Sequence, residues 1–256
     1  MERWEQKMER LKKLRCIDSF TLKLLAMALM LCDHMWATIV PGNLWLTCLG
    51  RLAFPIFAYQ IVEGFFCTRN FRRYWGRLFL FALLSEVPFN LMYGGSPVYP
   101  FHQNVLFTFC LALLLVRLLE KVRERSFPLF LAAAPLAAGA GYLLGMVLMV
   151  DYYGYGVLTV LVFYLARRSP WPWLLQLAGL GVINLGMMGG MQFSLSLFGR
   201  VWELPQQGLA LLALLPIWLY NGRPGRASRP LRLACYAFYP VHMAVLVLLW
   251  RMGSGI

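Results

Sequence analysis

Charged residues are scarce in this sequence, and acidic residues most of all. Only 14% of the 256 residues are charged, and 11 Asp and Glu stand against 24 Lys and Arg. Hydrophobic residues make up 60% of the chain, and the mean hydropathy is +0.62. Because a soluble domain of this length does not carry so many long apolar runs, the composition predicts a polytopic membrane protein.

Three further absences argue against other classes of protein. The six cysteines are scattered and form no Cys-x-x-Cys pair, so neither a disulfide framework nor a zinc site is indicated. The three histidines lack the close spacing of a metal site, so we expect no metal cofactor. The chain also shows no internal repeat or inverted symmetry of the kind found in many transporters.

Apolar stretches and basic connections alternate along the chain. The predicted spans are residues 22–40, 45–66, 74–93, 103–119, 127–150, 152–166, 171–190, 208–220 and 233–250. If these nine spans cross the membrane, 21 of the 24 basic residues fall on one side, and the positive-inside rule makes that side, with the N-terminus, cytoplasmic. The net charge of +13 therefore reflects topology and not nucleic-acid binding.

The predicted fold is an all-α bundle of about nine spans, with eight to ten as the range. Residues 191–207 are predicted to be an external loop, an interfacial helix or a re-entrant piece; the charge pattern argues against a tenth span there. Residues 1–21 form a basic cytoplasmic lead, in which residues 2–18 suit an amphipathic helix on the anionic inner leaflet or else a solvated tail. Residues 22–251 form one transmembrane domain, placed in the cytoplasmic membrane.

The first span contains an ionisable pair, Asp33 and His34. An intramembrane acid beside a histidine is by default a candidate functional site. Lys23 lies eleven residues earlier, which returns it to the face of His34 at the cytoplasmic edge of the helix.

Polar residues of the other spans fall at a similar depth in the outer half of the membrane. Together with the pair they are Asp33, His34, Arg51, Glu86, Asn90, Gln103, Asn104 and Asp151. The ionisable ones would cost on the order of 10 kcal/mol or more if each faced lipid. We therefore expect them to face each other or a wet cavity.

Several of these residues also have a structural interpretation. Asp151 suits the N-cap of a helix, and Arg51 with Glu86 suits a buried structural pair. His102 lies in a predicted loop and reads as an ordinary surface histidine. His242 follows Pro240 in the last span, where packing and chemistry are equally good explanations.

Several blocks in order resemble the TraX family, membrane proteins associated with N-terminal acetylation of conjugative pilin. The blocks are LKLLAMALMLCDH (22–34), GRLAFPIFAYQIVEGFFCTRN (50–70), RLFLFALLSEVPFNL (77–91), QNVLFTF (103–109) and DYYGYGVL (151–158). The family resembles a wider group of membrane acyltransferases with a basic residue ahead of a histidine, and Lys23-x10-His34 fits that pattern. The resemblance implies a catalytic His34, acetyl-CoA as the cytoplasmic donor, and an amine or hydroxyl acceptor such as a pilin N-terminus or a small molecule.

The residue chemistry is consistent with acyl transfer. A neutral His34 can act as the base, and Glu86, Asp151 or Asp33 could orient it. The side chains that could bind the oxyanion, acyl group or acceptor are Arg51, Asn90, Gln103, Asn104 and His242. The cations that could bind the phosphates of CoA are Lys23, Arg72, Arg73 and Arg77.

Two rival functions use the same residues. A proton-coupled transporter would use the buried His, Asp and Glu side chains as a relay, and solute flux without acetyl-CoA consumption would identify it. A scaffold would use them only to lock helix packing, so that alanine substitutions would change stability alone.

Overall fold

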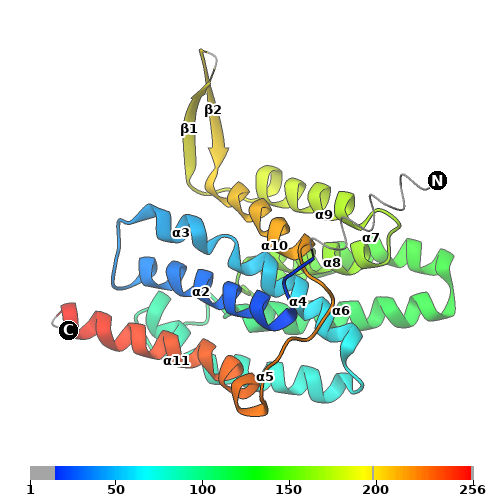
Figure 1. Cartoon of the computed structure of the whole chain (residues 1–256), viewed down its shortest axis with the longest axis horizontal. Coiled ribbons are helices and arrows are strands. Elements are labelled where there is room, and N and C mark those ends of the chain that lie inside the picture. The colour runs from blue at the N-terminus through cyan, green and yellow to red at the C-terminus, as the bar shows by residue number, and fades with distance from the viewer. Residues whose placement is uncertain (1–14, 198, 255–256) are drawn as a thin grey trace.

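The described part of the chain folds into a bundle of helices with a β-hairpin (Figure 1). The structure, a computed structural model, describes residues 15–197 and 199–254. The helices in the first part are α2 (Ser19–Ala37), α3 (Leu44–Gly50), α4 (Ala53–Cys67), α5 (Phe71–Tyr93), α6 (Val105–Arg125), α7 (Phe127–Val147) and α8 (Tyr153–Arg167). They are followed by α9 (Pro172–Gly181), π-helix η1 (Val182–Met187), strands β1 (Gln192–Leu197) and β2 (Arg200–Pro205), 3₁₀-helix η2 (Gln206–Ala213), α10 (Leu214–Trp218) and α11 (Arg229–Ser254).

Four stretches in the described part of the chain are long and apolar enough to cross a membrane. They are Ser19–Ala37, Leu44–Cys67, Phe127–Val147 and Leu233–Gly253. Helices α5 and α6 have 23 and 21 residues, but basic residues at one end of each lower their hydropathy. The predicted helical membrane fold agrees with this architecture, while the count of nine spans and the cytoplasmic N-terminus stay predictions.

The predicted seventh and eighth spans are short in the structure. Helices α9 and η1 together cover Pro172–Met187, and η2 with α10 covers Gln206–Trp218. A perpendicular span needs about 20 residues, so neither segment crosses a full hydrocarbon core as a straight helix.

The segment between them is a β-hairpin that projects from the helical body (Figure 1). Strands β1 and β2 pair antiparallel, with Gln192 opposite Pro205 and Leu197 opposite Arg200. The prediction of an interfacial helix for this segment was therefore wrong. The residues of β1 alternate polar with apolar, as a strand does. Gly199, with φ of 74°, lies in the turn, where only glycine adopts such a backbone without strain.

The predicted amphipathic helix of residues 2–18 lies mostly outside the described residues. Its last residues are not helical, because Ile17 forms a parallel bridge with Tyr220. Asp18 then caps α2 by accepting a hydrogen bond of 2.8 Å from the Thr21 backbone N–H. The cap fixes the start of the helix that carries His34.

Two apolar clusters fix the helices around the site. The larger one joins α4, α6 and α8 through fully buried side chains such as Ile56, Leu113 and Tyr164. The smaller one packs α11 against α2 and α5 through Met30, Phe89 and Met243. Because α2 and α11 run in the same direction, side chains at equal distances from their N-termini can meet (Figure 1).

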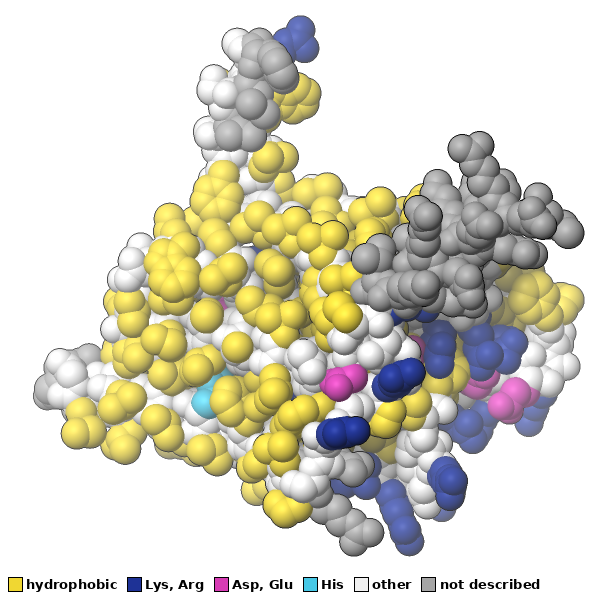
Figure 2. Space-filling model, in the orientation of Figure 1, with side chains coloured by type: hydrophobic (Ala, Val, Ile, Leu, Met, Phe, Trp, Pro, Cys, Tyr) yellow, Lys and Arg dark blue, Asp and Glu magenta, His cyan; other side chains and the backbone are white. Residues whose placement is uncertain are grey.

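The outer surface is that of a protein that meets lipid. Hydrophobic side chains cover most of the face in Figure 2, and the Lys and Arg side chains gather toward one end. On α5, for example, Leu80, Leu83, Leu84 and Val87 are each more than half exposed. This spacing forms one apolar helix face directed outward, as a membrane environment requires.

Candidate functional site

A cavity of about 300 Å³, which we call the outer cavity, lies where α2, α5 and α11 meet the α3–α4 junction and the loops before α6 and α8. Its polar lining includes Asp33, His34, Arg51, His102, Asp151 and Tyr239. The structure thus brings together four residues of the predicted cluster and adds His102, which had been expected on an ordinary surface.

His34 reaches the cavity from the buried face of α2. That face repeats every fourth residue, as Leu22, Ala26, Met30 and His34, and the His34 side chain is 7% exposed. Its Nδ1 atom lies 2.6 Å from Nε2 of His242 on α11. His242 therefore occupies the position beside the imidazole that the sequence predicts for Glu86, Asp151 or Asp33.

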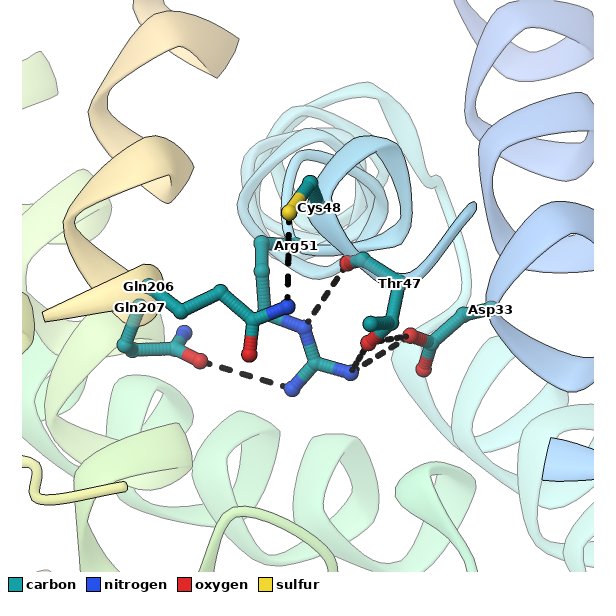
Figure 3. A network of polar contacts seen from close by, with 6 residues as sticks. All are labelled: Asp33, Thr47, Cys48, Arg51, Gln206 and Gln207. Carbon is teal, nitrogen blue, oxygen red and sulfur yellow. Dashed lines mark hydrogen bonds and ion pairs between the residues drawn. The ribbon is translucent and has the colours of Figure 1, made fainter. Parts of the chain in front are cut away.

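Arg51 and Asp33 form an ion pair at the break between α3 and α4 (Figure 3). Arg51 Nη2 lies 2.5 Å from Asp33 Oδ1, and the Thr47 hydroxyl donates to the same oxygen at 2.8 Å. The structural partner of Arg51 is thus Asp33 and not Glu86. The proline at position 55 lies in the first turn of α4, where a missing N–H costs no hydrogen bond.

The Arg51 contacts continue into the last third of the chain. Arg51 Nη1 reaches Gln207 Oε1 at 3.5 Å, and the Gln207 amide donates to Asn184 Oδ1 at 3.0 Å. Gln207 and Asn184 are 6% and 3% exposed. Neither residue is among those predicted from the sequence. Asn184, a lone amide within an apolar stretch, could have been found, because a buried amide needs a partner.

His102 pairs with Asp151 on the wall of the outer cavity. His102 Nε2 lies 3.2 Å from Asp151 Oδ1. Burial disfavours the charged imidazole, but the hydrogen bond and the charge of Asp151, with the charge of Glu86, outweigh burial and raise the pKa of His102 above its usual value. Asp151 is thus an ion-pair partner. It is not the predicted helix cap, because Tyr152 holds the N-cap position of α8 and no side chain caps that helix.

The chain around Asp151 is held in an unusual backbone conformation. Met149, Tyr152 and Tyr153 all have positive φ, at 50°, 58° and 48°. The Gln103 N–H donates to the Met149 carbonyl and the Asp151 N–H donates to the Gln103 carbonyl, each at 2.8 Å. Non-glycine residues in this region are strained and cluster at functional sites, which supports a role for this loop in the cavity.

The other four residues of the predicted polar cluster, Glu86, Asn90, Gln103 and Asn104, do not line the outer cavity. The Asn104 amide donates to Glu86 Oε2 at 2.6 Å, and its Oδ1 caps α6 by accepting from the Leu106 N–H. Asn90 donates to the Pro97 carbonyl and Gln103 to the Pro100 carbonyl. Their contacts join α5, α6 and the intervening loop, so they shape the cavity from behind.

A second cavity, of about 480 Å³, lies toward the Lys23 end of α2. Lys23, Gln60 and Glu63 line it, and Glu63 also pairs with Arg167 at 3.0 Å. Both cavities are lined by Met30, Phe57, Val105 and Tyr239. The two cavities therefore lie back to back, with these four side chains between them.

The three arginines predicted to bind phosphate lie on the N-terminal part of α5. Arg72, Arg73 and Arg77 are all exposed, and they do not line the second cavity. Tyr74 and Leu78 of the same turns do line it. The arginines thus lie on the outside of the helix that walls this cavity.

Comparisons with known proteins identify the family of this chain. A family model described as TraX protein matches residues 19–250. A protein of Dichelobacter nodosus, described as probable fimbrial assembly protein FimC, serogroup H1, is 30% identical over 243 residues, which cover 90% of this chain and 94% of that protein. No solved structure matches. The family match covers nearly the whole described bundle, and the chain belongs to the TraX family.

Proposed function

We propose that this protein is an integral membrane acyltransferase that uses His34 as its base. It transfers an acetyl group from cytoplasmic acetyl-CoA to an amine or hydroxyl acceptor that reaches the outer cavity. The observation that carries the proposal is the pair of back-to-back cavities, one lined by His34 and the other by Lys23.

The two cavities suit substrates that arrive from opposite sides. The second cavity is the larger one, and cavities of 300 to 1,000 Å³ are typical of small-molecule sites. A thioester arm that enters beside Lys23 would reach His34 only by passing Met30 and Phe57. The four shared side chains are apolar or aromatic, and such a partition can exclude water from the reacting thioester.

The reaction balances with one proton carrier. The acceptor nitrogen or oxygen attacks the thioester carbonyl carbon, and His34 takes the proton that the acceptor loses. The C–S bond then breaks, and the proton passes from His34 to the leaving sulfur as CoA thiol. The histidine returns to its neutral state, and no oxidant or metal is consumed.

Charged groups near His34 have separate roles in this proposal. Arg51 supplies positive charge beside the developing oxyanion, while Asp33, Thr47 and Gln207 hold its guanidinium in place. Lys23, with Arg72, Arg73 and Arg77 outside α5, supplies the cations for the phosphates of the donor.

The acceptor is proposed from the D. nodosus relative, whose printed name refers to fimbrial assembly. A fimbrial subunit presents an N-terminal amine with an ordinary pKa of about 7.7–8.0, so a large fraction is already neutral near pH 8. We therefore propose a peptide N-terminus as the acceptor class.

The test uses purified full-length protein in nanodiscs with radiolabelled acetyl-CoA and peptides that have free or blocked N-termini. We expect label transfer and release of free thiol only with the free amine, and loss of both in His34→Ala. Glu124→Gln is the matched control, because Glu124 is exposed on α6 away from both cavities. Transfer at the normal rate by folded His34→Ala would reject the catalytic assignment.

A transporter function would give a different result in the same preparation. Solute uptake into proteoliposomes without thiol release would favour a proton-coupled permease built on the same buried residues. Unchanged thiol and label in every arm, with normal folding, would reject the enzyme proposal.

A further inference from the structure

The two buried histidines meet edge to edge. His34 and His242 are 208 positions apart in the sequence, yet their ring nitrogens lie 2.6 Å apart. The ring planes are within 4° of parallel and the centroids are 4.9 Å apart. The centroid separation exceeds the N···N distance by about two ring radii, so the rings lie in one plane and share an in-plane hydrogen bond.

Two imidazole nitrogens at this distance must share one proton. The direction of the bond follows from the other nitrogen of His242, because Nδ1 lies 2.7 Å from the Phe238 backbone carbonyl. A carbonyl oxygen only accepts hydrogen bonds, so Nδ1 of His242 carries the hydrogen. In neutral His242 the Nε2 atom is then the acceptor, and Nδ1 of His34 is the donor.

This chain of donors leaves one nitrogen without a hydrogen. If Nδ1 of neutral His34 carries the proton, its Nε2 carries the lone pair. His34 lines the outer cavity, and no described residue forms a hydrogen bond with its Nε2.

We propose that His242 is a positioning residue that fixes His34 as the Nδ1–H tautomer and so presents Nε2 as the basic nitrogen in the cavity. The catalytic part of this inference rests on the proposed function, but the tautomer assignment does not. When Nε2 gains a proton during transfer, Nδ1–H of His34 still donates to His242, so the pair shares the positive charge. His242 thus acts through His34. The sequence instead predicts that His242 contacts the oxyanion, acyl group or acceptor.

Aromatic neighbours restrain both rings. Phe238 stacks on His242 with centroids 4.5 Å apart and planes within 10°. The ring centroid of Tyr239 lies 6.2 Å from that of His34 and 5.9 Å from that of His242. The Tyr93 ring meets the His34 ring edge-on, with centroids 6.4 Å apart. These contacts limit rotation of either imidazole, so the shared hydrogen bond is defined before substrate binds.

The tautomer can be measured without any enzyme assay. The chain has three histidines, so ¹⁵N-histidine NMR of the detergent-solubilised full chain gives few signals, which single variants assign. We expect Nδ1 of His34 to be protonated and Nε2 to be unprotonated at neutral pH. In His242→Ala, His34 should revert toward the Nε2–H tautomer that histidine prefers in water, while His102→Gln should leave the His34 signals unchanged.

The result separates this inference from the proposed function. An Nε2–H tautomer of His34 in the wild type, or an unchanged tautomer in folded His242→Ala, would overturn the inference whatever the activity. A fixed Nδ1–H tautomer in a protein that transfers no acetyl group would reject the proposed function and keep the tautomer assignment.

A kinetic readout tests the positioning role. We expect His242→Ala to lower kcat about 10- to 100-fold, as the loss of a residue that orients a site histidine does, with little change in KM for acetyl-CoA. His242→Gln keeps a side-chain acceptor and should restore part of the rate. Equal rates for His242→Ala and wild type would contradict the positioning role, as would equal loss in both variants.

Discussion

Arg51 and Asp33 are joined across the α2–α3 contact by an ion pair of 2.5 Å, although neither residue is fully buried. Their side chains are 20% and 17% exposed. Thr47 links the two by donating to Asp33 and accepting from Arg51. The pair therefore connects the helix of His34 to the break before α4.

Removal of either partner of this pair should destabilise the protein. Arg51→Ala leaves Asp33 as an unpaired charge, and we expect a loss of about 3 kcal/mol in the free energy of unfolding, with a similar loss for Asp33→Ala. Thermal unfolding in detergent measures the effect, with the exposed Arg251→Ala as the matched control. Strictly additive losses in the double variant would show that the two residues do not interact.

Gly50 is required where α3 approaches α2. A Cβ atom at this position would overlap the side chain of Asp33. Gly50→Ala should therefore cost about 1–3 kcal/mol by overpacking. The control is Gly76→Ala on α5, where nothing lies near the added methyl group and the helix should gain up to about 1 kcal/mol. Equal unfolding temperatures of the two variants would contradict the predicted contact.

The His102–Asp151 pair should make stability depend on pH. Because the pKa of His102 is raised in the folded protein, its contribution is fully present below the ordinary value of 6.5 and is lost as pH rises through the folded pKa. We expect the unfolding temperature of the wild type, relative to His102→Gln, to fall between about pH 6 and pH 8. A difference that stays constant across this range would show that His102 does not titrate with a raised pKa.

Glu120 joins α6 to α8 at the opposite end of the bundle. It accepts from the Tyr164 hydroxyl at 2.7 Å and pairs with Arg168 at 2.5 Å. Glu120→Gln removes the charge, and we expect a loss of about 1.5–3 kcal/mol in the free energy of unfolding.

Glu124→Gln is the matched control for Glu120, since Glu124 lies one turn later on α6 and is exposed. Chemical unfolding of both variants in mixed micelles gives the comparison. If Glu124→Gln loses as much stability as Glu120→Gln, the buried network is not the cause.

Part of the candidate site could be predicted from the depth of each polar residue in the predicted membrane topology. Asp33, His34, Arg51 and Asp151 share one level in the predicted topology, and all four line the outer cavity. Depth in the membrane could also have predicted His242 as the partner of His34. His242 lies ten residues after Arg232, and His34 lies eleven residues after Lys23. Because helices that start on the same side run in parallel, equal spacing from the basic edge puts both histidines at one level.

Depth could not show which side chains face each other around the bundle. Glu86, Asn90, Gln103 and Asn104 lie at the same predicted level but bind one another or nearby carbonyls behind the cavity. That choice depends on the rotation of each helix about its axis, which is set by packing against neighbours far away in the sequence.

By itself, the sequence determined the helical membrane character and the level at which polar groups gather, because apolar run length and charge spacing act locally along the chain. It also contained the alternating polar and apolar pattern of strand β1. Only the tertiary structure decided that His242 meets His34, that Asp33 meets Arg51, and that two cavities abut at Met30 and Phe57. These are contacts between segments up to 208 positions apart, and they form only when the packing of α11, α4 and α2 fixes the direction of each side chain.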